Sequence, residues 1–194
     1  MLATRNAHKV AELARILAPY DVELLGLDAF PAIDEVAESG ATFEANALIK
    51  ARAVAGASGL VAVADDSGLC VDALNGMPGV LSARWAGRHG DDAANLLLVL
   101  AQLADVADER RTAAFVCVAA AATPDGRDVV EHGRLDGALT REPRGENGFG
   151  YDPIFVPAGE WRTTAEMGPE EKDAVSHRGR AFRALAPLLE PLLG

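Results

Sequence analysis

Cysteine is scarce in this chain of 194 residues, which has only Cys70 and Cys117, each in an apolar run. The absence of CxxC and other zinc spacings argues against a zinc site, and the two residues are typical of buried free thiols in a reducing compartment. No apolar run approaches the length that spans a membrane. The N-terminus also lacks the charged and apolar regions of a signal peptide. We therefore expect a soluble, cytoplasmic protein without a membrane partner.

Several familiar catalytic and phosphate-binding patterns are missing too. There is no GxxxxGK[ST] loop, and the glycines around Phe149 do not extend to GxGxxG. HExxH and GxSxG are absent, and no cysteine is placed as an obvious nucleophile. Basic residues are also few, since 18 Lys and Arg face 29 Asp and Glu for a net charge of −11. This balance argues against a nucleic-acid partner, although it leaves room for a small cationic pocket.

What the chain does contain is enough apolar sequence for a sizeable core, at 49% hydrophobic residues. Its length falls within the usual range for one domain. We find no internal repeat, no low-complexity segment and no clear linker. The sequence therefore predicts a single domain over residues 1–194, within which two lobes are conceivable.

The central stretch runs from Leu60 to Gly68 and joins an apolar run to two adjacent carboxylates. Its first five residues are typical of a strand buried on both faces, and Ser67-Gly68 suggests a turn that ends it. Asp65 and Asp66 would then lie at the carboxyl end of a strand, where ligands gather in open α/β sheets. Two acids in that place favour Mg²⁺, which prefers oxygen ligands. The alternative is that both residues simply cap the turn.

Cations crowd the starts of two predicted helices, one after Asn6 and one at Ser176. They are Arg5, His8 and Lys9 at the first helix, and Lys172, His177 and Arg178 at the last one. Positive charge is disfavoured at a helix N-terminus by the helix dipole, and a bound phosphate would reverse that sign. The alternative is a solvated turn whose charges are screened by salt.

For Arg178 this reasoning gives a specific expectation. If the guanidinium opposes the dipole without an acidic partner, replacement by alanine leaves the stability of the ligand-free protein unchanged or slightly raised. The alternative pairs Arg178 with an acid such as Glu170 or Glu171, and replacement would then destabilise the protein. Pro187 is expected near the end of the same helix.

A third signal is the segment 144–153, in which three glycines alternate with Phe149 and Tyr151. Glycine lets a ligand approach backbone N–H groups closely, and an aromatic ring offers a stacking face for a planar base. The alternative is a tight loop with core aromatics. Taken together, the carboxylates, the cations and this loop indicate a nucleotide with a metal-bound phosphate tail.

An ordered set of motifs across nearly the whole chain resembles the inosine triphosphate pyrophosphatase family, also called the Ham1 family. The matching segments are residues 3–9, 42–51, 64–69, 76–79, 82–84, 148–153 and 176–179. The resemblance implies an α/β fold, with a long twisted mixed sheet flanked by helices and two lobes with an active-site cleft between them. It also implies a homodimer and Mg²⁺-dependent hydrolysis of ITP, dITP and XTP to the monophosphate and pyrophosphate.

The resemblance further assigns roles to individual residues. Asp66 would be the catalytic acid or base and a metal ligand, and Glu38 would be a second metal ligand. The substrate-binding residues would be Thr4, Arg5, Asn6, Ala7, His8, Lys9, Lys50, Ser67, Phe149, Gly150, Tyr151, Asp152, Lys172, His177 and Arg178. Donors to a purine 6-oxo group would come from His177, Arg178 and backbone N–H groups near Phe149.

One departure from the family pattern concerns the acid that follows the acidic loop of Asp34, Glu35 and Glu38. In Phe43-Glu44-Ala45-Asn46 this acid stands one residue earlier than in the family. A shift of one residue turns a helical side chain by about 100°, so Glu44 is not assigned as a ligand.

Two other functions remain open at this point. A haloacid-dehalogenase-like phosphatase would use an aspartyl nucleophile, but that chemistry requires Asp-x-Asp, and here the acids are adjacent. A non-catalytic sensor would bind nucleotide with Mg²⁺ and release no product.

Overall fold

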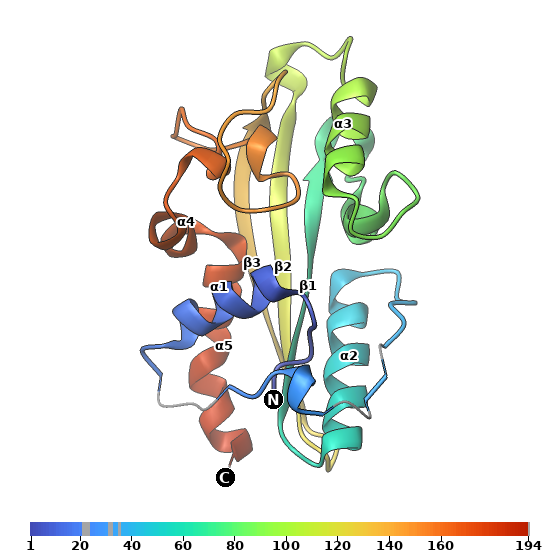
Figure 1. The fold of residues 1–194 in the computed structure, drawn as a ribbon, viewed down its shortest axis with the longest axis vertical. Coiled ribbons are helices and arrows are strands. Elements are labelled where there is room, and N and C mark those ends of the chain that lie inside the picture. The colour runs from blue at the N-terminus through green and yellow to red at the C-terminus, as the bar shows by residue number, and fades with distance from the viewer. Residues whose placement is uncertain (21–23, 31–32, 35, 194) are drawn as a thin grey trace. The chain divides into compact units, whose positions relative to one another are not determined.

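The computed structural model describes residues 1–20, 24–30, 33–34 and 36–193, and it has an α/β architecture (Figure 1). The helices are α1 Ala7–Leu17, α2 Phe43–Ser58, α3 Asp92–Gln102, α4 Pro169–Val175 and α5 His177–Leu193. The strands are β1 Ala62–Val71, β2 Thr112–Ala122, β3 Asp128–Leu139 and β4 Phe155–Pro157. Across the described part of the chain, no helix is long and apolar enough to cross a membrane.

The four strands form one sheet in the order β1-β2-β3-β4. Strand β4 pairs antiparallel with β3, with Leu139 opposite Phe155. Leu2 adds parallel bridges to Val63 and Gly26, so the sheet is mixed, as predicted.

The chain divides into two compact units, which we describe separately. Unit 1 comprises residues 1–66, 117–133 and 177–194, and unit 2 comprises residues 67–116 and 134–176. The predicted cleft between lobes stays a prediction.

Unit 1 has helices on both faces of its strands (Figure 1). On one face, Val63 and Cys117 pack in a cluster with apolar side chains of α1 and α5. On the other face, Ala62 and Ala64 pack against Ala47 and neighbouring residues of α2. Successive strand residues alternate between these two clusters because strand side chains have a period of two. Small alanines on both partners allow α2 to lie close to the strands.

Unit 2 has a core of its own, built on the remaining parts of the strands. Leu96 and Val99 of α3 cluster with Leu69 of β1 and with two phenylalanines. The rings of Phe115 and Phe155 lie with their centroids 4.4 Å apart. This packing fixes α3 against the sheet of its own unit.

The predicted end of the central strand is wrong, because β1 continues through Ser67 and Gly68 to Val71. Gly68 is needed for close packing rather than for a turn. A Cβ at this position would collide with the carbonyl oxygen of Gly79 and with the hydroxyl of Ser82. The two carboxylates therefore lie within a strand and not at its end.

The predicted helix starts agree with the structure. The Asn6 side chain caps α1 by accepting hydrogen bonds from two backbone N–H groups of its first turn, and Thr42 caps α2. Helix α5 continues past Pro187 to Leu193, so Pro187 and Pro191 both lie in its C-terminal part. Leu185 and Leu189 are buried against the sheet, and this packing supports the helix past the first proline.

Candidate active site

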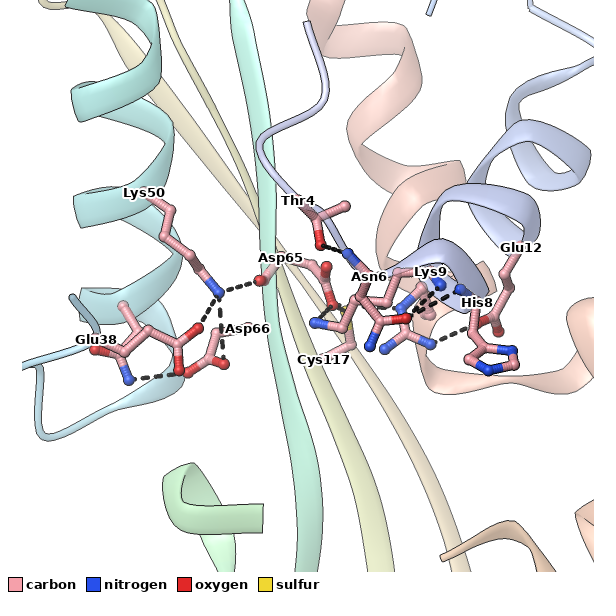
Figure 2. Close-up of polar contacts among 12 residues, drawn as sticks. Thr4, Asn6, His8, Lys9, Glu12, Glu38, Lys50, Asp65, Asp66 and Cys117 are labelled. Atoms are coloured by element: carbon pink, nitrogen blue, oxygen red, sulfur yellow. Dashed lines mark hydrogen bonds and ion pairs between the residues drawn. The ribbon is translucent and has the colours of Figure 1, made fainter. Parts of the chain in front are cut away.

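The two adjacent carboxylates of β1 leave the strand toward opposite faces (Figure 2). Asp65 follows Val63 toward α1 and α5, whereas Asp66 follows Ala64 toward α2. Both side chains are buried, with exposed fractions of 3% and 5%. The pleat of one strand thus creates two different environments from one Asp-Asp pair.

Asp66 shares a single ammonium group with a second carboxylate. Lys50 of α2 donates to Glu38 over 2.7 Å and lies 3.7 Å from the Asp66 carboxylate. One turn earlier in the helix, the Asn46 amide donates to Asp66 over 3.0 Å. The same Asn46 side chain accepts from the backbone N–H of Gly40 and so ties the acidic loop to the strand. Figure 2 shows Glu38, Lys50 and Asp66 turned toward one another.

This arrangement raises the pKa of Asp66 above its ordinary value. Burial is the main cause, because it disfavours the charged carboxylate. Lys50 opposes the shift, but the negative charge of Glu38 adds to it. The upward shift makes this carboxylate a better proton acceptor than an ordinary aspartate, which is the direction a general base requires.

The same geometry shows that Glu38, and not Glu44, lies beside the ammonium group that Asp66 shares. Glu44 points elsewhere, with its carboxylate 3.4 Å from the imidazole of His132 in an exposed pair. Glu38 is joined to Asp66 through Lys50. Glu35 of the acidic loop lies outside the described residues.

The oxygen donors on this face suit a hard divalent cation. Mg²⁺ is usually bound by one or two carboxylates and completes its shell with water and substrate phosphates. Asp66 and Glu38 supply two carboxylates around one ammonium, which leaves an excess of negative charge. Among the described residues, no group of three or more His, Cys, Asp or Glu side chains is clustered as a metal site. A two-carboxylate arrangement is therefore the donor set that the structure offers.

Asp65, on the opposite face, is surrounded by cations. Its carboxylate accepts from the Lys9 ammonium over 2.9 Å and from the Arg178 guanidinium over 3.3 Å. The same guanidinium donates to Glu12 of α1, and both of these side chains are almost fully buried. The Cys117 thiol lies 3.9 Å from the same Asp65 oxygen.

These cations reverse the effect of burial on Asp65. Burial alone would raise the pKa of the carboxyl, but Lys9, Arg178 and Lys50 outweigh it and hold the pKa far below its ordinary value. The pKa of the Cys117 thiol moves the other way, because burial and then the charge of Asp65 both raise it. Cys117 is therefore a protonated thiol and not a nucleophile.

The structure contradicts the expectation that Arg178 lacks an acidic partner. Its guanidinium forms ion pairs with Glu12 and Asp65. Because a buried ion pair is costly to break from one side, removal of this arginine must destabilise the ligand-free protein. The proposed contact of Arg178 with substrate stays a prediction.

The start of α1 supplies the first group of predicted phosphate-binding residues. They are Thr4, Arg5, Asn6, Ala7, His8 and Lys9, and all lie in unit 1. The Asn6 side chain already accepts from two backbone N–H groups of the helix. Arg5 donates to the carbonyl oxygen of Ile33 over 2.7 Å, and Lys9 is bound to Asp65. Arg5, Asn6 and Lys9 are therefore held by contacts within unit 1, and the role of all six residues toward phosphate stays a prediction.

The start of α5 brings the predicted residues His177 and Arg178 to the same unit. Both are buried. Gly133 of β3 makes this possible, because a Cβ there would collide with the carbonyl oxygen of His177 and would lie 2.7 Å from the Ala181 nitrogen.

In unit 2, the aromatic-glycine loop is organised around Asp152. Gly148 and Gly150 adopt φ of +76° and +61°, which places Phe149 on a tight arch. The buried Asp152 carboxylate accepts from the Phe149 backbone N–H over 2.8 Å and from the Lys172 ammonium over 2.6 Å. The same ammonium lies 5.1 Å from the centroid of the Phe149 ring. The structure thus brings three of the predicted residues together.

The other predicted residues of unit 2 differ in role. Tyr151 is buried, and its hydroxyl donates to the carbonyl oxygen of Ser82 over 2.8 Å. Ser67 is half-buried within β1. Tyr151 is therefore an anchor in the core, and the stacking of a base on Phe149 stays a prediction.

Sequence reasoning missed three polar residues that organise these sites, namely Glu12, Asn46 and Asp92. Glu12 and Asn46 each lie on the buried face of a helix, beside Leu13 and Ala47. A charged or amide side chain at such a position is a signal of a buried polar contact. Asp92 holds the Phe149 loop, and nothing local in the sequence indicated it.

Comparisons with known proteins cover almost the whole chain. The model of the Ham1 family matches residues 1–188. A dITP/XTP pyrophosphatase of Streptomyces coelicolor is 62% identical over 198 residues, which cover 100% of this chain and 98% of the relative. The crystal structure of a nucleoside-triphosphatase, or dITP/XTP pyrophosphatase, from Mycobacterium abscessus is 63% identical, with 97% of each chain covered and a TM-score of 0.78. A HAM1 protein from Coxiella burnetii is 43% identical, with 98% and 97% covered and a TM-score of 0.88.

Proposed function

The chain belongs to the Ham1 family, and on this premise we propose that it hydrolyses ITP, dITP and XTP to the nucleoside monophosphate and pyrophosphate. The observation that carries the proposal is the pair of carboxylates, Asp66 and Glu38, that share the ammonium of Lys50. This pair occurs in a chain that is 62% identical to a dITP/XTP pyrophosphatase.

Asp66 is the residue we propose to activate water. A general base works best when its pKa lies near the operating pH, and burial together with Glu38 moves the pKa of Asp66 in that direction. Asn46 fixes the orientation of the carboxylate by donating to one of its oxygens. Water deprotonated by Asp66 would attack the α-phosphorus, and pyrophosphate would leave.

Asp66 and Glu38 would also hold Mg²⁺, because their carboxylate oxygens match its preference. When bound, Mg²⁺ would neutralise phosphate oxygens and hold the tail in place. Lys50 remains beside the pair and can stabilise negative charge that develops on the leaving group. The chain's own part in the reaction is therefore to orient a carboxylate and to supply fixed cations.

Unit 2 supplies a platform for a purine base. The Phe149 ring has one cation, Lys172, next to it, and Asp152 fixes that ammonium in place. A planar base stacks on such a ring, with typical gains of about 1–3 kcal/mol. A 6-oxo group would accept hydrogen bonds that the 6-amino group of adenine cannot accept. We therefore expect kcat/KM for ATP to be lower than for ITP by a factor of up to about 10⁴.

The phosphatase alternative is less favoured by the geometry. That chemistry requires Asp-x-Asp, whereas the two acids here are adjacent and point to opposite faces of β1, and the Asp65 carboxylate is already bound by Lys9 and Arg178. A sensor that binds nucleotide without turnover is the other alternative, and it differs in releasing no product.

We also propose that the protein acts as a cytoplasmic homodimer.

Product analysis tests the proposed function. Purified protein is incubated with Mg²⁺ and a panel of ITP, dITP, XTP, ATP and GTP, and pyrophosphate and orthophosphate are detected separately. We expect IMP and pyrophosphate from ITP, and a loss of turnover when EDTA removes the metal. Orthophosphate with the diphosphate would point to a phosphatase, and binding without any product would point to a sensor.

A further inference from the structure

Asp92 connects the start of α3 to the loop that carries Phe149. Its carboxylate accepts from the backbone N–H of Gly150 over 2.9 Å, although the two residues lie 58 positions apart. The preceding N–H, of Phe149, donates to Asp152 over 2.8 Å. Two consecutive backbone donors of one loop are thus held by two carboxylates from different parts of unit 2.

The neighbouring Asp91 does a different task at the same helix start. Its side chain accepts from the backbone N–H of Ala94 and caps α3. Because the cap is already supplied by Asp91, the Asp92 carboxylate is not needed for it. The charge of Asp92 is also felt by the buried Tyr151 hydroxyl, whose pKa is raised by burial first and by Asp92 second. The Asp92 carboxylate is therefore available to hold the Gly150 N–H.

The consequence for the Phe149 ring follows from the backbone of the loop. Gly148 and Gly150 both have positive φ. Because glycine adopts negative φ about as readily, these two positions do not fix the loop conformation by themselves. The hydrogen bond from Gly150 to Asp92 restricts the residue directly after Phe149. Asp152 restricts Phe149 itself and also holds Lys172.

We propose that Asp92 is a positioning residue for the nucleobase: it holds Gly150 and thereby keeps the Phe149 ring beside Lys172, ready to stack against a purine. The proposal rests on the proposed function for the identity of the ligand. Asp92 acts through the loop and does not need to touch the substrate. Its loss should weaken the binding of ligands that carry a base and leave the binding of the phosphate tail unchanged.

The test compares Asp92→Ala and Asp92→Asn with the matched control Asp91→Ala. Calorimetric titration measures the Kd of IMP, which carries a base, and of pyrophosphate, which does not. We expect Asp92→Ala to raise the Kd of IMP about tenfold, which corresponds to one lost hydrogen bond, without changing that of pyrophosphate. Asp92→Asn keeps an oxygen acceptor and should largely restore IMP binding. Asp91→Ala should lower the melting temperature and leave both Kd values as in the wild type.

Amide exchange gives a readout that does not depend on activity. The Gly150 N–H should exchange faster in Asp92→Ala than in the wild type, and it should be unaffected in Asp91→Ala. Equal changes in the Kd of IMP and pyrophosphate, or wild-type IMP binding in Asp92→Ala, would overturn the proposal. If the wild type binds IMP but releases no pyrophosphate from ITP, the proposed hydrolysis fails while the role of Asp92 in base binding is still decided by these titrations.

Discussion

The two faces of β1 treat neighbouring carboxylates in opposite ways. On the α1 and α5 face, Asp65 is bound by Lys9 and Arg178, and its pKa is far below the ordinary value. On the α2 face, Asp66 shares Lys50 with another acid, and its pKa is raised. Both side chains are buried in one strand, so burial by itself does not set the difference. The charges around each carboxylate do, because Asp65 meets two cations, whereas Asp66 shares Lys50 of α2 with Glu38 of the preceding loop.

This difference separates a structural role from a chemical one. A buried carboxylate that is saturated by cations is fixed in its charged form and contributes through ion pairs. A buried carboxylate with an excess of negative charge around it is poised to gain a proton or a cation. Under the proposed function, the face of α2 would be the reactive one, and the face of α1 and α5 would support the fold.

The largest effect on activity is expected from Asp66→Asn. The change removes the proposed general base, and kcat should fall by roughly 10²–10⁴. Apo stability should be unchanged or raised, because the raised pKa shows that the charged form is disfavoured in the fold. Steady-state kinetics of the purified variant measure kcat, and thermal melts of the same preparation measure its stability. Near-normal turnover in a folded variant would remove Asp66 from the reaction.

The largest effect on stability is expected from Arg178→Ala on the opposite face. Removing this cation leaves Asp65 and Glu12 buried without it, and breaking such a pair from one side typically costs about 3–5 kcal/mol. Denaturant unfolding measures the loss. Arg127→Ala is a suitable control, because its ion pair with Asp125 is exposed and should contribute little to stability. Equal losses in the two variants would show that Arg178 is not a supporting residue.

The two carboxylates should also give opposite dependences of stability on pH. Because the folded pKa of Asp65 lies below the ordinary value of 3.8, its stabilising contribution is present above that pH and is lost as the pH falls below it. The raised pKa of Asp66 gives stability at low pH that is lost as the pH rises through that pKa. Relative to wild type, Asp65→Asn should lose less stability on acidification, and Asp66→Asn should gain stability toward neutral pH. Unfolding curves from about pH 3 to 7 measure both trends, and parallel curves for the two variants would contradict the comparison.

The smallest effect distinguishes two acids near α2. Glu38→Gln should raise the Mg²⁺ concentration needed for half-maximal activity by roughly 10–100-fold, the range seen when support of a metal site is lost. Glu44→Gln is the matched control, because its carboxylate pairs with the exposed His132 instead. Activity measured across a Mg²⁺ titration separates the two variants. A larger shift in Glu44→Gln would show that Glu44, at the start of α2, is the second metal ligand instead of Glu38.

Local sequence signals were sufficient for most of the elements. Asn6 and Thr42 mark helix starts because short polar side chains satisfy the exposed N–H groups of a first turn. The apolar run after Leu60 and the one around Cys117 became buried strands. The ordered motifs identified the family and the candidate site residues Asp66, Glu38 and Lys50. The structure brings these three side chains together.

The contacts that distinguish the two faces of β1 were decided by the tertiary structure alone. The Asp-Asp pair followed by Ser-Gly suggests the end of a strand, and only the close packing at Gly68 shows why the strand continues. Within the continuous strand, the pleat directs the two side chains to opposite faces. Glu12 and Arg178 are 166 residues apart, so no local pattern predicts that one neutralises the other. The sequence by itself determined which residue types are available and where helices begin. Which carboxylate is saturated and which stays reactive depends on charges that meet only when α1, α2 and α5 pack on the sheet, because electrostatic pairing follows distance in space and not along the chain.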